Sequence, residues 1–76
     1  MRRYHIDNET EPVREIQTYL LEVAHTDDRI PKVTIDGHYG DTTRDAVKAF
    51  QNIEGISKTG IVDFETWVLL HIPVYI

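Results

Sequence analysis

Apolar residues recur at helical spacing in three stretches of the chain. In the first, over residues 12–25, they fall three or four positions apart, which would place them in one stripe along a helix. The stripe consists of Val13, Ile16, Leu20 and Val23, widened by Leu21 and Ala24. Pro12 suits a first helical turn, where its missing N–H is no loss, and Thr10 or Glu11 is the expected N-cap. The pattern predicts a first helix over residues 12–25.

The second stretch predicts a helix over residues 41–54. Its inward positions are Ala46, Val47, Phe50 and Ile53. Gly55 can adopt the left-handed conformation that ends a helix, and Ile56 directly after it can fold back in a Schellman ending.

The third stretch predicts a short helix over residues 64–71. Asp63 is its natural N-cap, and Val62 stands where a hydrophobic staple would reach Trp67. The expected fold is therefore all-α, a small three-helix bundle. The two ends of the chain, residues 2–6 and 72–76, have β-like patterns and are expected to form a short β pairing, with Pro73 confining it to an edge.

Two segments of the chain form a half-repeat. Each combines a glycine turn, a large inward-pointing side chain and a helix start. The matched positions are Gly37 with Gly60, Tyr39 with Val62, Thr43 with Thr66, and Ala46-Val47 with Leu69-Leu70. We expect both glycines to supply positive φ or a close backbone approach in the turns. We also expect both threonine hydroxyls to bond to local backbone, and the two helices to begin near one another.

Composition narrows the classes of protein that remain. Seventy-six residues allow one small domain, and the absence of cysteine excludes disulfides and zinc–thiolate sites. A net charge of −5 argues against a nucleic-acid surface, which needs a basic face. No apolar run approaches the ~20 residues of a membrane span. The first nine residues lack the apolar middle of a signal peptide, so a soluble domain is expected.

Four motifs follow one another over residues 12–71. They are Val13-x-x-Ile16-Gln17-x-x-Leu20; Ile35-Asp36-Gly37-x-Tyr39-Gly40-x-x-Thr43-x-x-Ala46-Val47-x-x-Phe50-Gln51; Gly55; and Thr59-Gly60-x-Val62-Asp63-x-x-Thr66-Trp67. The ordered set resembles the peptidoglycan-binding-like domain, a three-helix module attached to many bacterial cell-wall hydrolases. Asp41 and Phe64 depart from the family pattern, which often has Pro there. Both are acceptable in a first helical turn, and Asp41 complements the helix dipole.

The resemblance implies non-covalent attachment to peptidoglycan. Such a module would hold a linked or associated hydrolase, or an assembly, at the cell wall or outside the cell. The same fold is related to the pro-segment of matrix metalloproteases, so fold alone does not decide the function.

The candidate binding residues flank the two predicted helix starts. Exposed N–H groups at a helix N-terminus favour anions. The expected ligand is the stem peptide of peptidoglycan, which carries carboxylates and amines, or its glycan, which carries acetamido groups, or both. We predict that a groove flanked by His38, Asp41, Thr42 and Arg44, with Glu65 opposite, contacts a stem peptide. Arg44 could pair with a peptide carboxylate.

Catalytic and metal sites are not expected. Asp36-x-His38-x-x-Asp41 lacks the ligand pattern of a calcium loop, and Asp36 and Asp41 fit turn and cap roles instead. His5, His25 and His71 look isolated, and Ser57 has no motif around it. Trp67 fits the core better than a sugar-stacking platform. We therefore predict a non-enzymatic chain without a cofactor.

A second class of function remains open. The apolar tail 72–76 and the segment with Tyr4 and Ile6 could recruit a protein partner through an unpaired edge. The alternative is thus a protein–protein interaction or structural adaptor subunit, or a pro-segment-like regulator of a hydrolase.

Overall fold

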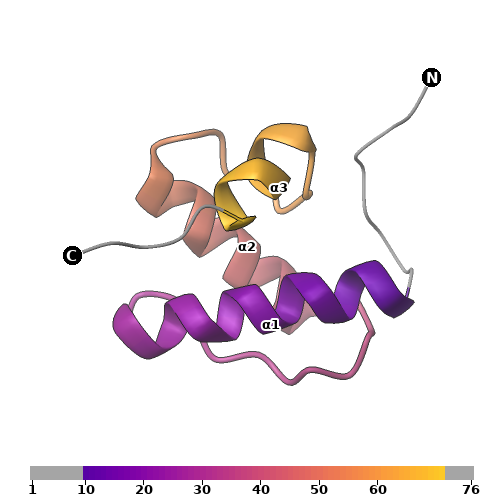
Figure 1. The fold of residues 1–76 in the computed structure, drawn as a ribbon. Coiled ribbons are helices and arrows are strands. Elements are labelled where there is room, and N and C mark those ends of the chain that lie inside the picture. The colour runs from indigo at the N-terminus through magenta and orange to yellow at the C-terminus, as the bar shows by residue number, and fades with distance from the viewer. Residues whose placement is uncertain (1–9, 72–76) are drawn as a thin grey trace.

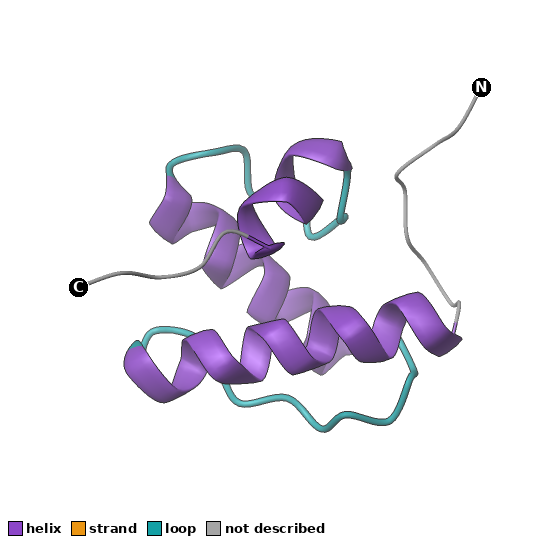
Figure 2. Ribbon diagram, viewed as in Figure 1, coloured by secondary structure: helices purple, strands orange, loops and turns teal. Residues whose placement is uncertain are grey.

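The computed structural model describes residues 10–71, which form three α-helices and no β-strand (Figure 1). The helices are α1 (Thr10–Thr26), α2 (Asp41–Glu54) and α3 (Phe64–His71). A first loop, residues 27–40, and a second loop, residues 55–63, connect them (Figure 2). The predicted all-α, three-helix fold is confirmed, and the bounds of α2 and α3 are those predicted.

The start of α1 differs from the prediction. The helix begins at Thr10 and ends at Thr26. Thr10 and Glu11 therefore lie inside the helix, and the expectation that one of them is the N-cap is wrong. Pro12 falls in the first turn, where a helix tolerates it. The predicted β pairing of residues 2–6 with 72–76 lies outside the described residues.

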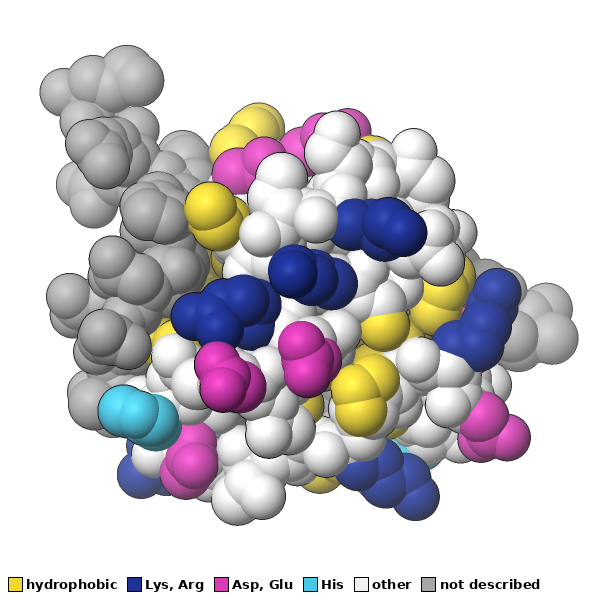
Figure 3. All heavy atoms as spheres, turned by 180° about the vertical axis from the view of Figure 1, so that it is seen from behind, with side chains coloured by type: hydrophobic (Ala, Val, Ile, Leu, Met, Phe, Trp, Pro, Cys, Tyr) yellow, Lys and Arg dark blue, Asp and Glu magenta, His cyan; other side chains and the backbone are white. Residues whose placement is uncertain are grey.

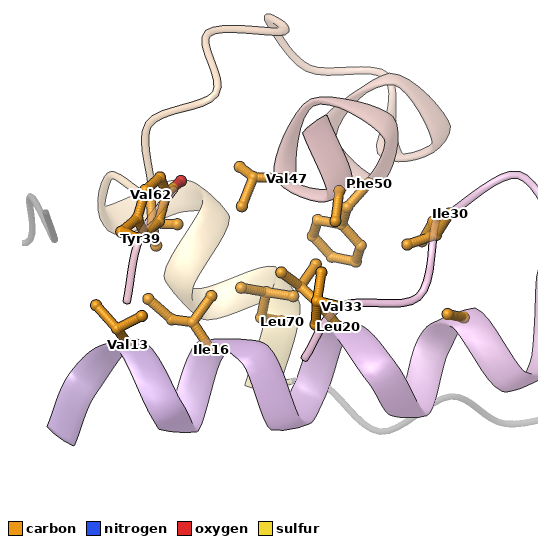
Figure 4. Close-up of a cluster of buried hydrophobic side chains, with 12 residues drawn as sticks. Val13, Ile16, Leu20, Ile30, Val33, Tyr39, Val47, Phe50, Val62 and Leu70 are labelled. Carbon is orange, nitrogen blue, oxygen red and sulfur yellow. The ribbon is translucent and has the colours of Figure 1, made fainter. Parts of the chain in front are cut away.

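The core lies between α1 and the two helices that pack against it (Figure 4). Its buried apolar side chains are Val13, Ile16, Leu20, Ala24, Ile30, Val33, Tyr39, Ala46, Val47, Phe50, Val62 and Leu70. The predicted core residues Leu21, Val23, Ile53 and Trp67 are partly buried and pack against this cluster. The first loop thus adds Ile30 and Val33 to the apolar stripes of the helices.

The helix ends follow from the residues that stand there. Gly55 has φ 78°, and its N–H donates to the Asn52 carbonyl while the Ile56 N–H donates to the Gln51 carbonyl at 3.0 Å. These two bonds are the predicted Schellman ending. At the start of α3, Asp63 Oδ1 accepts a hydrogen bond from the Thr66 N–H at 3.0 Å, which confirms Asp63 as N-cap.

Gln51 is buried on the inward face of α2, near the C-terminal end of the helix, with 1% of its surface exposed. Its Oε1 accepts a hydrogen bond from the Gly60 N–H at 2.9 Å. Its Nε2 donates to the Ile61 carbonyl and to Thr66 Oγ1, each at 3.0 Å. One side chain of α2 therefore fixes the second loop and the first turn of α3.

Gln17 does the same for the first loop from α1, and it is equally buried. Its Oε1 accepts from the N–H groups of Asp36 and Gly37 at 3.0 and 2.9 Å. Its Nε2 lies 3.1 Å from the His38 carbonyl and 3.0 Å from Thr43 Oγ1. The half-repeat is therefore longer than predicted, because each unit begins with a glutamine on the preceding helix and α2 belongs to both units.

The glycines and threonines of the half-repeat occupy equivalent places. Gly37 and Gly60 both have φ 76°, as predicted. Thr43 and Thr66 are both buried, but the prediction that their hydroxyls bond to local backbone is wrong. Each hydroxyl instead accepts a hydrogen bond from the glutamine of its unit.

Candidate ligand-binding site at the start of α2

A shallow hollow of about 210 Å³ opens beside the first turn of α2. The first loop and α2 line it with polar and small residues: Thr34, Asp36, His38, Gly40, Asp41, Thr42 and Thr43. The hollow brings together His38, Asp41 and Thr42 of the predicted site. Thr34, Asp36, Gly40 and Thr43 line it as well, although the prediction did not place them in the binding groove.

Asp36 lies in the turn of the first loop and is one of the residues that line the hollow. Its Oδ1 accepts hydrogen bonds from the His38 N–H at 2.9 Å and from Gln17 Nε2 at 3.0 Å. These two bonds hold the pKa of the Asp36 carboxyl below its usual value, and the bond from the His38 N–H has the larger effect. Asp36 is thus the turn residue that the sequence predicted, and it adds a negative charge to the wall of the hollow.

The first turn of α2 presents backbone N–H groups that no side chain caps. Gly40 is the N-cap residue, so this position has no side-chain oxygen, and its carbonyl accepts the Arg44 N–H at 3.0 Å. The first N–H groups of any helix lack partners within the helix. Gly40, Asp41, Thr42 and Thr43 of this turn line the hollow, so an anionic group bound there would lie close to the helix start, which favours negative charge.

Arg44 and Glu65 do not line this hollow. Arg44 Nη1 forms an ion pair with Asp41 Oδ1 at 2.8 Å, in which Asp41 is 97% exposed. A pair so exposed contributes little to stability, so Arg44 can exchange Asp41 for another carboxylate. The position of Arg44 is one turn along the helix from the edge of the hollow, and Glu65 is exposed on the first turn of α3.

Tyr39 connects the first loop directly to the second loop. Its hydroxyl donates a hydrogen bond to the Gly60 carbonyl at 2.6 Å, and its side chain belongs to the same buried core cluster as Val62 and Val13 (Figure 4). Burial raises the pKa of Tyr39 to about 12, although the nearby Arg44 charge acts in the opposite direction. The hydroxyl therefore remains a donor at physiological pH. This bond brings Tyr39 to Gly60, and it ties the residue between His38 and Gly40, two lining residues of the hollow, to the second loop.

Tyr39→Phe is expected to reduce the free energy of unfolding by about 1–2 kcal/mol, because the ring stays and only the buried hydroxyl is lost. Urea unfolding would measure the change. Tyr19→Phe is the matched control, since the described contact of Tyr19 is made through its ring; we expect it to change the stability by less than about 0.5 kcal/mol. Equal losses in both variants would contradict the loop-bridging role of Tyr39.

Side chains of both charges occur on the face opposite to the view of Figure 1, where several Lys and Arg side chains form a row with Asp and Glu side chains beside it (Figure 3). Arg44 and Lys48 both reach over Gly60, and Asp41 neutralises the first of them. Among residues 10–71, no three His, Asp or Glu side chains gather as metal ligands would. Within the same range, no helix is long and apolar enough to cross a membrane.

His71 is not isolated, contrary to the prediction. Its ring contacts Trp67 and Tyr19, and its Nε2 lies 2.9 Å from Glu15 Oε2. Glu15 and His71 are separated by 56 positions in the chain, so no local pattern could indicate the pair. Trp67 itself is partly buried against the core.

Comparison of the sequence with known protein families identifies one that matches. Residues 9–70 match the family model described as "Putative peptidoglycan binding domain". No curated protein matches the chain, and no solved structure does so. The match covers most of the 76 residues and includes α1, α2, both loops and α3 as far as Leu70. The chain therefore belongs to the peptidoglycan-binding domain family.

Proposed function

We propose that this chain is a non-catalytic module that attaches to peptidoglycan through the hollow at the start of α2 and holds a linked or associated hydrolase, or an assembly, at the cell wall. The family match over residues 9–70 supports wall binding. The observation that carries the site is the hollow itself, which places the uncapped first turn of α2 beside the side chains of Asp41, Thr42 and His38. We place a stem peptide there.

A carboxylate of the stem peptide would bind at the uncapped first turn of α2. The N–H groups and the helix dipole favour negative charge at that end. Arg44 would turn from Asp41 to the same carboxylate, because the ion pair that it leaves is exposed. His38 and Asp36, on the opposite wall, would face the amine or amide groups of the peptide. Glu65 would act only with longer ligands, since it does not line the hollow.

The affinity for one stem peptide is expected to be weak. The hollow is small, open and polar, so little apolar surface would be buried on binding. Firm attachment would then need a linked domain or several copies, each of which raises the effective concentration of the others. This property suits an anchor that keeps a partner near the wall without immobilising it.

Thr42→Glu tests the site with a single charge. The side chain is exposed, and a carboxylate in the first helical turn is compatible with the helix dipole, so the fold should be retained. We expect the fraction of protein that sediments with insoluble peptidoglycan to imply a roughly threefold to tenfold weaker affinity, because a nearby like charge costs on the order of 1 kcal/mol.

Asn52→Glu is the matched control, because it adds the same charge to an exposed position near the other end of α2. We expect it to bind like the wild type. Equal weakening in both variants would remove the site from the start of α2. Stronger binding by Thr42→Glu would show that the hollow takes an amine instead of a carboxylate. Failure of the wild-type protein to sediment would reject wall binding itself.

The second candidate is a protein–protein interaction or adaptor module, or a pro-segment-like regulator of a hydrolase. It is favoured by two exposed apolar side chains: Ile61 of the second loop, which is 45% exposed, and Val68 of α3, which is 39% exposed. A mass in solution that rises with protein concentration, together with no sedimentation with peptidoglycan, would favour this candidate over the first.

A further inference from the structure

His71, the last residue of α3, lies between two hydrogen-bond acceptors. Its Nδ1 is 2.6 Å from the carbonyl oxygen of Trp67, one turn earlier in α3. Its Nε2 is 2.9 Å from Oε2 of Glu15, on α1. A carbonyl oxygen and an ionised carboxylate can only accept, so both ring nitrogens must carry hydrogen for both bonds to form. The geometry therefore fits the positively charged imidazolium.

The surroundings of the ring also suit a cation. Tyr19 of α1 and Trp67 of α3 have ring centroids 4.5 and 4.3 Å from that of His71. Aromatic rings attract cations at such distances. Glu15 and Tyr19 are the titratable groups that α1 brings to His71, and Trp67 is the neighbour from its own helix. The only full negative charge among these neighbours is therefore that of Glu15.

The two hydrogen bonds change the proton affinity of the ring. Burial acts to lower the pKa of His71, but the bonds to the Glu15 carboxylate and the Trp67 carbonyl outweigh it. The pKa of His71 thus lies above its usual value near 6.5. The side chains of His71 and Glu15 are 28% and 46% exposed, so solvent reaches the pair and protons can exchange freely.

We propose that His71 is a pH-sensitive clasp, whose charged form joins the end of α3 to Glu15 on α1 and whose neutral form releases that connection. The folded protein holds the proton more tightly than the unfolded chain. The clasp therefore stabilises the fold fully below the unfolded value, near 6.5, and its contribution is lost as the pH rises through the folded value. Its loss would loosen α3, which follows the second glycine loop.

An NMR titration of the His71 ring tests the clasp in the intact chain. We expect Glu15→Gln to lower the midpoint of the His71 titration, because the amide cannot supply the negative charge. Glu22→Gln, an exposed change two turns further along α1, is the matched control and should leave the midpoint in place. An unchanged midpoint in Glu15→Gln would overturn the proposal.

Urea unfolding at several pH values provides the second readout. The wild-type midpoint should fall between pH 6 and pH 9 by more than that of His71→Gln, whose side chain cannot titrate. Amide exchange in α3 should accelerate over the same range by a larger factor than in α2. Parallel pH profiles for wild type and His71→Gln would contradict the clasp, since a merely structural contact would not depend on the proton.

Discussion

Replacing Gln17 with leucine is expected to lower the free energy of unfolding by about 2–4 kcal/mol, although leucine has a similar size and suits a helix. The Gly37 N–H is buried and donates to Gln17 Oε1 at 2.9 Å. Leucine leaves this donor without its acceptor, and it also removes the bond from Nε2 to Thr43 Oγ1. The Asp36 N–H suffers less, because it also approaches the Thr34 carbonyl at 3.0 Å.

Thr18→Leu is the matched control for this experiment. Thr18 is the next residue of α1, but it is exposed, and its hydroxyl bonds only to the Arg14 carbonyl one turn earlier. Its replacement should change the stability by less than about 0.5 kcal/mol in urea unfolding. Amide shifts of Gly37 and His38 should move in Gln17→Leu and stay in Thr18→Leu. A stable Gln17→Leu with unchanged loop shifts would show that the glutamine does not organise the loop.

The helices could be predicted from the sequence because their signals are local. The apolar spacing of α1 and α2, Gly55 as a stop and Asp63 as a cap each depend on residues within one or two turns. The exact start of α1 could not be predicted, since residues at a helix start have similar preferences over several positions.

The roles of the two glutamines could not be predicted in the same way. A polar residue within an apolar stripe does not reveal its partners, and those of Gln17 stand 19 to 26 positions away. The prediction for the two threonine hydroxyls failed because their partners, Gln17 and Gln51, are likewise distant in the sequence. The half-repeat nevertheless contained the signal, because Gln17 and Gln51 both follow an apolar residue one position before and another four positions before.

The candidate site was predictable in its position and less so in its outline. His38, Asp41 and Thr42 are close in sequence and fall on one hollow. Thr34 joins them from the preceding loop, which follows no regular period, so its place depended on how Ile30 and Val33 anchor that loop to the core. Arg44 falls outside the hollow, because the helical turn carries it around the axis of α2. Glu65 lies on α3, which contributes no residue to the hollow.

Gly60→Ala is expected to destabilise the domain by about 2–4 kcal/mol, more than a change of conformation alone would cause. Gly60 has φ 76°, which costs an L-residue about 1–2 kcal/mol. In addition, an added Cβ would lie 2.7 Å from Cγ of Arg44, too close for any real contact. The backbone cannot shift easily to relieve this clash, since its N–H is held by Gln51 and its carbonyl by Tyr39.

Gly55→Ala separates the two contributions. Gly55 has nearly the same φ, 78°, but an added Cβ would meet no atom within 4 Å. We therefore expect Gly55→Ala to lose only the conformational part, about 1 kcal/mol, in urea unfolding. Equal losses of stability at the two glycines would show that the close approach of Arg44 to Gly60 does not add to the destabilisation.

Arg44→Ala then identifies the source of the remaining loss. Its Cγ is the atom nearest to the added Cβ, so combining Arg44→Ala with Gly60→Ala should recover about 1 kcal/mol or more relative to the sum of the single changes. The recovery would be incomplete, because Lys48 Cε also lies 3.1 Å from the same position. Strict additivity would instead mean that the loop moves away from α2 as a whole. In that case the stability losses caused by Tyr39→Phe and Gly60→Ala should not add in the double variant, since both changes would release the same hydrogen bond between the two loops.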